Sequence, residues 1–151
     1  MNDPDEITAW QRINRRTTTS GKLRAANVQQ LADIGMRHVI NLALDDHPEA
    51  LREEAGLLRA ARIRYTHLPV PFDGPNDAHF EAFVAAYEAD DEPVHVHCIA
   101  NMRVSAFLYR YHRDRDGMPE AQARTLMEQQ WSPDTSDHPV TLPWARFIAA
   151  S

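Results

Sequence analysis

The sequence predicts an α/β fold in which helices flank a central, mostly parallel sheet. Short β-rich runs alternate along the chain with stretches of helical apolar periodicity. One run, VHVHC, has the compact apolar character of a strand at the centre of a parallel sheet. The length of 151 residues suits one domain and is too short for two. We therefore expect a single domain over residues 1–151, with the first few residues and a C-terminal helix at 139–151 peripheral.

The first half of the chain contains two predicted helices and two predicted strands. Asn27 is a candidate cap for the first helix, and Gly35 ends it. The β-rich run 38–44 predicts the first strand. Residues 48–62 start with a proline and continue with good helix formers, which indicates the second helix. The run 64–70, followed by a proline, predicts the second strand.

The second half continues the alternation and contains most of the predicted helices. Two apolar stripes with spacing i, i+3, i+4 and i+7 each predict an amphipathic helix. The stripes are Phe80, Phe83, Val84 and Tyr87, and then Val104, Phe107, Leu108 and Tyr111. Between them, Pro93 precedes a predicted central strand at 94–98. Further helices are predicted from Pro119 to Trp131 and over 143–150.

Composition excludes several classes of function. Acidic residues outnumber basic ones by 22 to 16, and a general nucleic-acid binder needs a basic field instead. No run approaches the roughly 18 apolar residues of a membrane span. The start, MNDPDEITAW, lacks the layout of a secretion signal, and one cysteine forms no internal disulfide. We therefore expect a cytoplasmic protein that binds neither nucleic acid nor membranes.

The lone cysteine, Cys98, lies between a predicted strand and a predicted helix. A helix N-terminus has unpaired N–H groups and a positive partial charge, which lower the pKa of a thiol and favour the nucleophilic thiolate. The same N–H groups bind oxyanions such as phosphate. Arg103, five positions later, has a planar guanidinium that forms two parallel hydrogen bonds to phosphate oxygens. The pattern predicts a nucleophile beside an anion site.

His97 and Cys98 followed by Arg103 resemble the active loop of the cysteine-dependent tyrosine and dual-specificity phosphatases. The segments TTSGKL, HVINLAL, RYTHLPVPFD and PVHVHC, within residues 17–115, are similar in order and spacing to the small dual-specificity core. The resemblance implies a cysteinyl-phosphate intermediate, an arginine that binds phosphoryl oxygens and, at Asp73, an acid that protonates the leaving oxygen. It implies a phosphorylated protein or a small phosphoester as substrate, and no cofactor.

The loop departs from the family pattern in three ways. Four residues separate the cysteine from the arginine where the family has five, and the usual glycine is replaced by Asn101, which tolerates a left-handed backbone. Val104 replaces the usual hydroxyl residue, so Ser105 is the candidate that supports the thiolate. This HC-x-AN-x-R form is similar to a nonclassical bacterial branch of phosphatase-like proteins, and we expect weak or selective activity. The predicted phosphate-binding loop is His97, Cys98, Ile99, Ala100, Asn101, Met102 and Arg103.

Each candidate residue also has a structural interpretation. A free cysteine such as Cys98 is often a buried core thiol. Asp73 lies in a turn-forming PFDGP segment, and Asp77 is the alternative acid or a helix cap. His95 and His97 point to one face of a strand, but no second cysteine or H-E-x-x-H pattern completes a zinc site, so we expect no metal.

Two other functions remain open. Rhodanese-like sulfurtransferases also use a cysteine loop on an α/β domain, commonly of six residues, and residues 98–103 have that length. Sulfur transfer, however, has no need of Asp73. The second alternative is a phosphatase-like module that captures phosphorylated ligands without turnover, which the short loop without glycine would suit.

Overall fold

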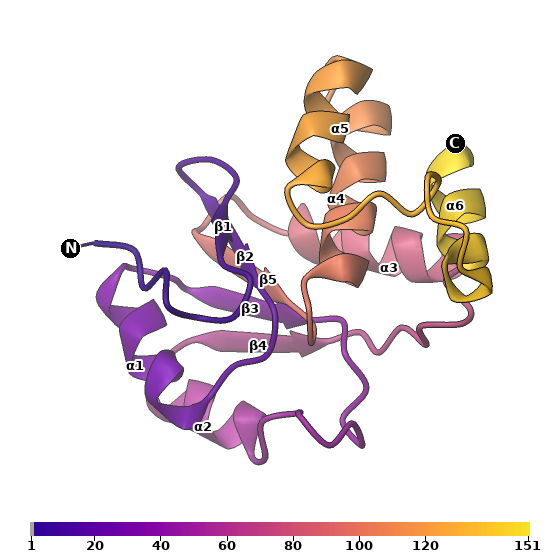
Figure 1. Ribbon diagram of the computed structural model, residues 1–151. Coiled ribbons are helices and arrows are strands. Elements are labelled where there is room, and N and C mark those ends of the chain that lie inside the picture. The colour runs from indigo at the N-terminus through magenta and orange to yellow at the C-terminus, as the bar shows by residue number, and fades with distance from the viewer. Residues whose placement is uncertain (1) are drawn as a thin grey trace.

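The computed structural model describes residues 2–151 and contains a five-stranded sheet with helices on both faces (Figure 1). The strand order is β1-β2-β5-β3-β4. The last four strands are parallel, and β1 is antiparallel to β2. The predicted α/β class with a central, mostly parallel sheet is therefore confirmed. The strands are β1 (Gln11–Arg12), β2 (Thr17–Ser20), β3 (His38–Asn41), β4 (Arg64–His67) and β5 (Val94–His97); the helices are α1 (Ala25–Asp33), α2 (Glu54–Ala60), α3 (Asp77–Tyr87), α4 (Met102–Asp114), α5 (Glu120–Glu128) and α6 (Leu142–Ala149), with a short 3-10 turn at Pro139–Thr141.

Helices α1 and α2 cover one face of the sheet, and α3 to α6 lie on the other (Figure 1). Because successive strand residues point to opposite faces, the buried neighbours Val39 and Ile40 enter different cores. The smaller core includes Leu31 and Leu58 from α1 and α2. The larger core includes Phe107 from α4. Each sheet face is thus covered by helices, as a parallel sheet requires.

Helix α6 belongs to the larger core. Trp144 is fully buried, and its indole Nε1 donates to the carbonyl oxygen of Phe72 at 2.5 Å. Phe147 stacks on Phe107 with ring centroids 4.7 Å apart. The expectation of a peripheral helix at 139–151 is therefore corrected, since its aromatic side chains bury large apolar areas and fix the loop that follows β4.

Several element boundaries differ from the sequence-based expectation. The polar segment TTTS forms β2, whose four residues are all buried, and apolar periodicity gave no signal for it. Helix α2 begins at Glu54 instead of residue 48, because Glu53 has a left-handed φ of 60°. Asn27 lies inside α1, where its Oδ1 accepts a hydrogen bond from the backbone N–H of the capping residue Arg24 at 2.7 Å.

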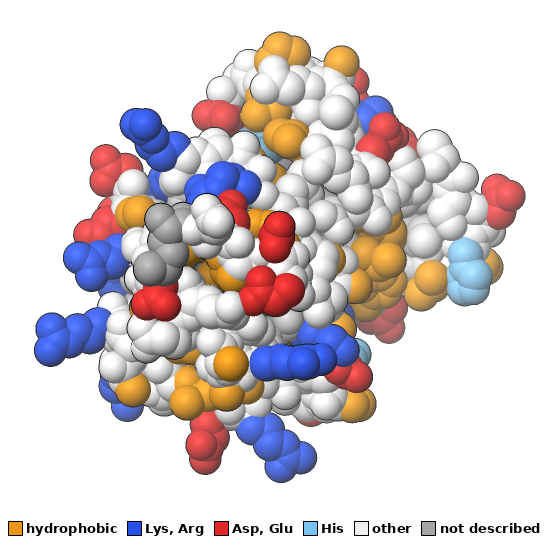
Figure 2. All heavy atoms as spheres, turned by 60° about the vertical axis from the view of Figure 1, so that its left-hand side comes forward, with side chains coloured by type: hydrophobic (Ala, Val, Ile, Leu, Met, Phe, Trp, Pro, Cys, Tyr) orange, Lys and Arg blue, Asp and Glu red, His pale blue; other side chains and the backbone are white. Residues whose placement is uncertain are grey.

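Surface charges on the α1 side are mixed. In the view of Figure 2, basic and acidic side chains are interspersed with apolar atoms, without a broad surface of one sign. Arg12 pairs with Asp3 and Lys22 pairs with Glu49, each at 2.6 Å. Exposed pairs of this kind add little stability. This face therefore offers no broad positive surface to an anionic ligand.

His95, in the centre of the sheet, is fully buried and neutral. Its ring nitrogens lie 2.8 Å from Thr18 Oγ1 and 2.8 Å from Ser20 Oγ. The Ser20 hydroxyl already donates to the carbonyl of Gly21, so it accepts from His95 Nε2, which carries the ring proton. Burial lowers the pKa of His95 well below its usual value.

Acidification below about pH 6.5 is expected to destabilise the fold before the carboxylates titrate. Burial lowers the pKa values of His38, His95 and His112, so the unfolded chain takes up protons that the folded chain does not. The free energy of unfolding therefore decreases as the pH decreases, by about 1.4 kcal/mol per pH unit for one such proton. Urea unfolding between pH 7.5 and 5.5 measures this, and His95→Gln should lower the slope by about one proton. An unchanged slope would contradict the assignment.

Candidate active site

The predicted loop lies at the carboxyl edge of the parallel strands. Strand β5 ends at His97 and α4 begins at Met102, so residues 98–101 connect them. Open α/β sheets bind ligands at this edge. Cys98 is 1% exposed and packs in the larger core, and its backbone N–H donates to the Ser20 carbonyl at 3.4 Å. The 13-residue helix α4 directs the positive end of its dipole at this loop.

Six consecutive backbone N–H groups, those of residues 99–104, have no acceptor within residues 2–151. The first N–H groups of any helix lack intrahelical partners, and here the series begins three residues before α4. Asn101 has a left-handed φ of 63°, as its residue type predicts, and does not cap the helix. Its amide donates instead to Ala9 O at 2.9 Å and Thr19 Oγ1 at 3.0 Å. Such a series of N–H groups forms an anion-binding concavity.

Arg103 presents an unpaired guanidinium to the same loop. The side chain is 6% exposed, and it makes no hydrogen bond to the described part of the chain. The guanidinium carbon lies 5.4 Å from the ring centroid of Phe72. A buried cation without a counter-ion is costly, so this group is suited to an anionic ligand. It lines a cavity of ≈ 380 Å³, and the other lining residues are Leu44, His47, Phe72, Ile99, Ala100 and Met102.

The connection after β2 packs closely against the loop. A Cβ atom on Gly21 would lie 2.3 Å from the carbonyl oxygen of Ile99, so only glycine fits there. The next residue, Lys22, donates its backbone N–H to the same carbonyl at 2.8 Å. The Ile99 carbonyl therefore accepts from the segment after β2, and it does not accept from the Arg103 N–H as it would in a continuous helix.

The predicted acid, Asp73, lies in the exposed turn between β4 and α3. Its neighbour Phe72 lines the Arg103 cavity, whereas Asp73 lines a second cavity of ≈ 370 Å³ beside Arg146 of α6. The structure therefore places Ile99, Ala100, Met102 and Arg103 around one cavity, and the lining of that cavity includes neither Cys98 nor Asp73.

The alternative acid, Asp77, is the first residue of α3 and has a side chain that is 79% exposed. It accepts a hydrogen bond from Arg110 Nη1 at 3.1 Å. Asn76 caps this helix, since its Oδ1 accepts from the His79 backbone N–H at 2.8 Å. The prediction that Asp77 caps this helix is therefore wrong, because the cap is the preceding residue, Asn76.

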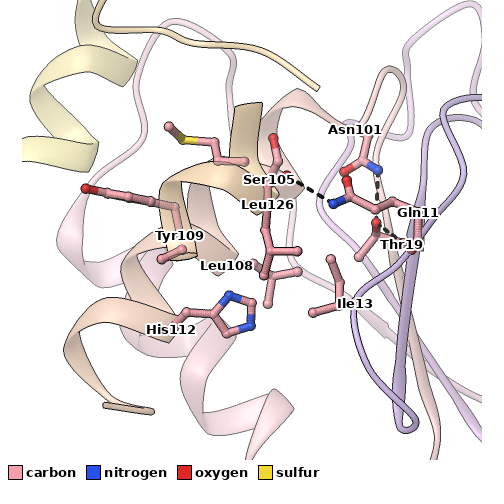
Figure 3. A pocket seen from close by; sticks show the side chains of 11 residues that line it. Gln11, Ile13, Thr19, Asn101, Ser105, Leu108, Tyr109, His112 and Leu126 are labelled. Atoms are coloured by element: carbon pink, nitrogen blue, oxygen red, sulfur yellow. Dashed lines mark hydrogen bonds between the residues drawn. The ribbon is translucent and has the colours of Figure 1, made fainter. Parts of the chain in front are cut away.

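Ser105 directs its hydroxyl at its own helix. The hydroxyl donates to the carbonyl of Met102 at 3.1 Å, which uses its only proton. With Asn101 and His112, Ser105 borders a cavity of ≈ 10 Å³ between α4, α5 and β2 (Figure 3). That volume holds one water molecule at most. This cavity shares no lining residue with the Arg103 cavity.

His97 contacts a carboxylate that sequence reasoning missed. Glu54 of α2 is 5% exposed, and its Oε2 lies 2.8 Å from His97 Nε2. The other ring nitrogen, Nδ1, lies 3.1 Å from the carbonyl oxygen of Cys98. Glu53 and Glu54 are identical in type and adjacent in sequence, and only the start of α2 decides which one is buried. No local pattern could have identified Glu54.

Residues 2–151 contain no cluster of three or more His, Cys, Asp or Glu side chains arranged to hold a metal ion. None of the helices in that range combines the length and apolar character needed to cross a membrane.

Solved structures similar to this chain include a candidate phosphatase (DUF442) from Shewanella putrefaciens CN-32. It is 30% identical, with 97% of this chain and 93% of that chain covered and a TM-score of 0.83. P. aeruginosa TpbA in complex with pTyr is 20% identical, with 100% and 95% covered and a TM-score of 0.70. PTPMT1 in complex with PI(5)P is 17% identical, with 93% and 94% covered and a TM-score of 0.69. The last two share the fold. No curated protein matches the chain.

A family model matches residues 11–110, which include every strand of the sheet and the loop from Cys98 to Arg103. This range is more than half of the chain. As the resemblance predicts, the fold is that of the tyrosine-phosphatase-like proteins. The chain belongs to the family of the phosphatase-like domain of beta-lactamase hydrolase-like proteins.

Proposed function

We propose that this chain hydrolyses phosphate monoesters through a covalent cysteinyl-phosphate on Cys98. The carrying observation is the anion cradle on the loop that starts with this cysteine. Six N–H groups without acceptors in residues 2–151 and the buried, unpaired guanidinium of Arg103 supply positive potential without a counter-ion. A dianionic phosphoryl group suits this combination of donors. The family and the 30% identical neighbour support a phosphatase.

In the first step, the Cys98 thiolate attacks phosphorus. The S–P bond forms as the bond from phosphorus to the leaving oxygen breaks, and the leaving oxygen takes the proton of Asp73. The equatorial phosphoryl oxygens accept hydrogen bonds from the loop N–H groups and from Arg103, where charge develops in the transition state.

In the second step, water attacks the phosphorus of the cysteinyl-phosphate. The Asp73 carboxylate, now deprotonated, accepts a proton from that water while the S–P bond breaks. Inorganic phosphate leaves, and both the thiolate and the protonated acid are regenerated. Covalent catalysis thus divides one difficult displacement into two easier ones.

The substrate class follows from the walls of the cavity. Leu44, Phe72 and Met102 offer apolar contacts beside the arginine, which suits an aryl group attached to the phosphate. We therefore propose phosphotyrosine-type or small aryl phosphoesters as substrates, with weak or selective turnover because the loop is one residue shorter than the family pattern.

The test uses phenyl phosphate, with thiosulfate plus cyanide as a parallel assay. Phosphate release, together with a phosphoryl group on the Cys98 peptide after rapid quenching, supports the proposal; because the chain has a single cysteine, this assignment is unambiguous. Thiocyanate formation would establish sulfur transfer instead. Binding of phosphate without any release would establish a capture module, and either result would overturn the proposal.

Asp73→Asn is expected to lower kcat for phenyl phosphate about 10²-fold. Asp73 has no hydrogen-bond partner within residues 2–151 and follows Phe72 of the Arg103 cavity, whereas Asp77 is held by Arg110. The deficit should shrink with p-nitrophenyl phosphate, whose better leaving group needs no proton. Asp77→Asn is the matched control and should stay within about threefold of the parent. Reversed effects of the two variants would reassign the acid to Asp77.

A further inference from the structure

Glu54 and His97 form a buried candidate ion pair beneath the loop. Neither side chain takes part in the two proposed displacement steps at phosphorus. The two side chains are 5% and 4% exposed, and they come from α2 and β5. We propose that Glu54 is a positioning residue that keeps His97 doubly protonated and thereby favours the thiolate form of Cys98. This inference rests on the proposed nucleophilic role of Cys98 and assigns the control of its reactivity.

The protonation of His97 follows from its two partners. Nε2 faces the Glu54 carboxylate at 2.8 Å and Nδ1 faces the Cys98 carbonyl at 3.1 Å. Both partners are acceptors, and a neutral imidazole has only one N–H to donate. With Glu54 ionised, a neutral ring would leave a buried nitrogen lone pair facing an oxygen lone pair. The imidazolium satisfies both contacts, and the Glu54 carboxylate compensates its charge in a buried environment.

The carbonyl bond of His97 connects this pair to the anion cradle. The Cys98 carbonyl and the Ile99 N–H belong to one planar trans peptide unit, so they point in opposite directions. Holding the Cys98 carbonyl toward His97 therefore turns the Ile99 N–H away from His97. That N–H is the first of the six without an acceptor in residues 2–151. As the resemblance to the tyrosine phosphatases implies for the histidine before the cysteine, a positive ring behind the loop favours negative charge on the Cys98 sulfur.

The neighbouring groups leave Glu54 as the counter-ion of His97. His95 stacks on His97 with ring centroids 6.1 Å apart, and burial lowers its pKa well below its usual value, so it is neutral. Burial, together with Glu54, raises the pKa of Tyr65 on β4 to about 12, so this phenol is neutral too. The other titratable or charged groups around the pair and the loop include Asp45, Asp46, His47, Arg52 and Glu53 in the segment before α2, His67 on β4 and Arg103 on α4. Lys22, whose backbone N–H donates to the Ile99 carbonyl, is paired with Glu49.

The test is alkylation of the single cysteine by iodoacetamide at a series of pH values, followed by intact mass. In Glu54→Gln, which keeps the size and an oxygen acceptor but removes the charge, the alkylation midpoint should move up by about one pH unit. The rate at pH 6 should fall about 10-fold, since the thiolate is the reacting form. Glu53→Gln removes the same charge from an exposed neighbour and should leave the profile unchanged.

An unchanged midpoint in folded Glu54→Gln would overturn the proposal. If this variant does not fold, ¹⁵N spectra of histidine-labelled wild-type protein show directly which nitrogens of the His97 ring carry protons. At pH 7.5 the His97 ring should carry protons on both nitrogens, and a neutral ring would overturn the proposal. Neither measurement depends on turnover. A chain that alkylates as expected but releases no phosphate would contradict the proposed function and leave the role of Glu54 supported.

Discussion

Cys98→Ser is expected to lower kcat/KM for phenyl phosphate by about 10⁴-fold or more. The substitution replaces sulfur with oxygen at a 1% exposed position, so the packing of the larger core changes little. A hydroxyl remains protonated near neutral pH and is a weak nucleophile without an adjacent base, whereas a thiol at a helix N-terminus ionises readily. The covalent step therefore stops.

Phosphate binding provides the control for this variant. The N–H groups of residues 99–104 and the guanidinium of Arg103 are untouched by the change. Titration calorimetry with inorganic phosphate should therefore give a Kd for Cys98→Ser within a few-fold of the parent value. Loss of both binding and turnover would indicate that the loop had collapsed. Retention of more than a tenth of the activity would rule out a covalent role for Cys98.

The local part of the site is predictable from sequence because its parts are contiguous. Strand, loop and helix follow one another from β5 to α4, and the change from strand-like to helical periodicity locates the N–H groups of the helix start beside Cys98. The residue type of Asn101 predicts its left-handed backbone, which the structure has at a φ of 63°. Arg103 falls in the first turn of the same helix, so its proximity to the loop needs no tertiary information.

The remaining parts depend on contacts between distant segments. Glu54 reaches His97 across 43 positions of sequence, and Trp144 donates to the Phe72 carbonyl across 72. Strand β2 pairs its polar side chains with His95 on the neighbouring strand, so burial there follows from hydrogen bonding and leaves no apolar pattern. Apolar periodicity indicates which face of a segment is buried and which is exposed to solvent. It carries no information about which distant group forms the hydrogen bond of a buried polar side chain.

The acidic net charge of −6 is compatible with an anionic ligand because the positive potential is local. Charge on the surface acts over about a Debye length and is weakened by salt, whereas a desolvated guanidinium acts at contact distance. The overall charge therefore affects the rate at which a polyanion approaches. In the proposed site, the affinity for one phosphoryl group depends on Arg103 and the loop.

Arg103→Lys is expected to lower kcat/KM for phenyl phosphate about 10³-fold although the charge is kept. In the proposed site the planar guanidinium donates two parallel hydrogen bonds to phosphoryl oxygens, and its carbon lies 5.4 Å from the centroid of the Phe72 ring. A compact ammonium offers neither the bidentate geometry nor planar stacking on that ring. The ammonium is also more strongly hydrated, so burying it at a 6% exposed position costs more.

Steady-state kinetics and phosphate titration of Arg103→Lys separate bidentate recognition from simple charge. We expect kcat to fall further than phosphate affinity, because the hydrogen bonds strengthen as charge develops on the phosphoryl oxygens in the transition state. Arg37→Lys, the same change at an exposed position, is the control and should leave both quantities unchanged. If Arg103→Lys stays within threefold of the parent, positive charge alone suffices, and the N–H groups of the loop must supply the directional recognition of the phosphoryl group.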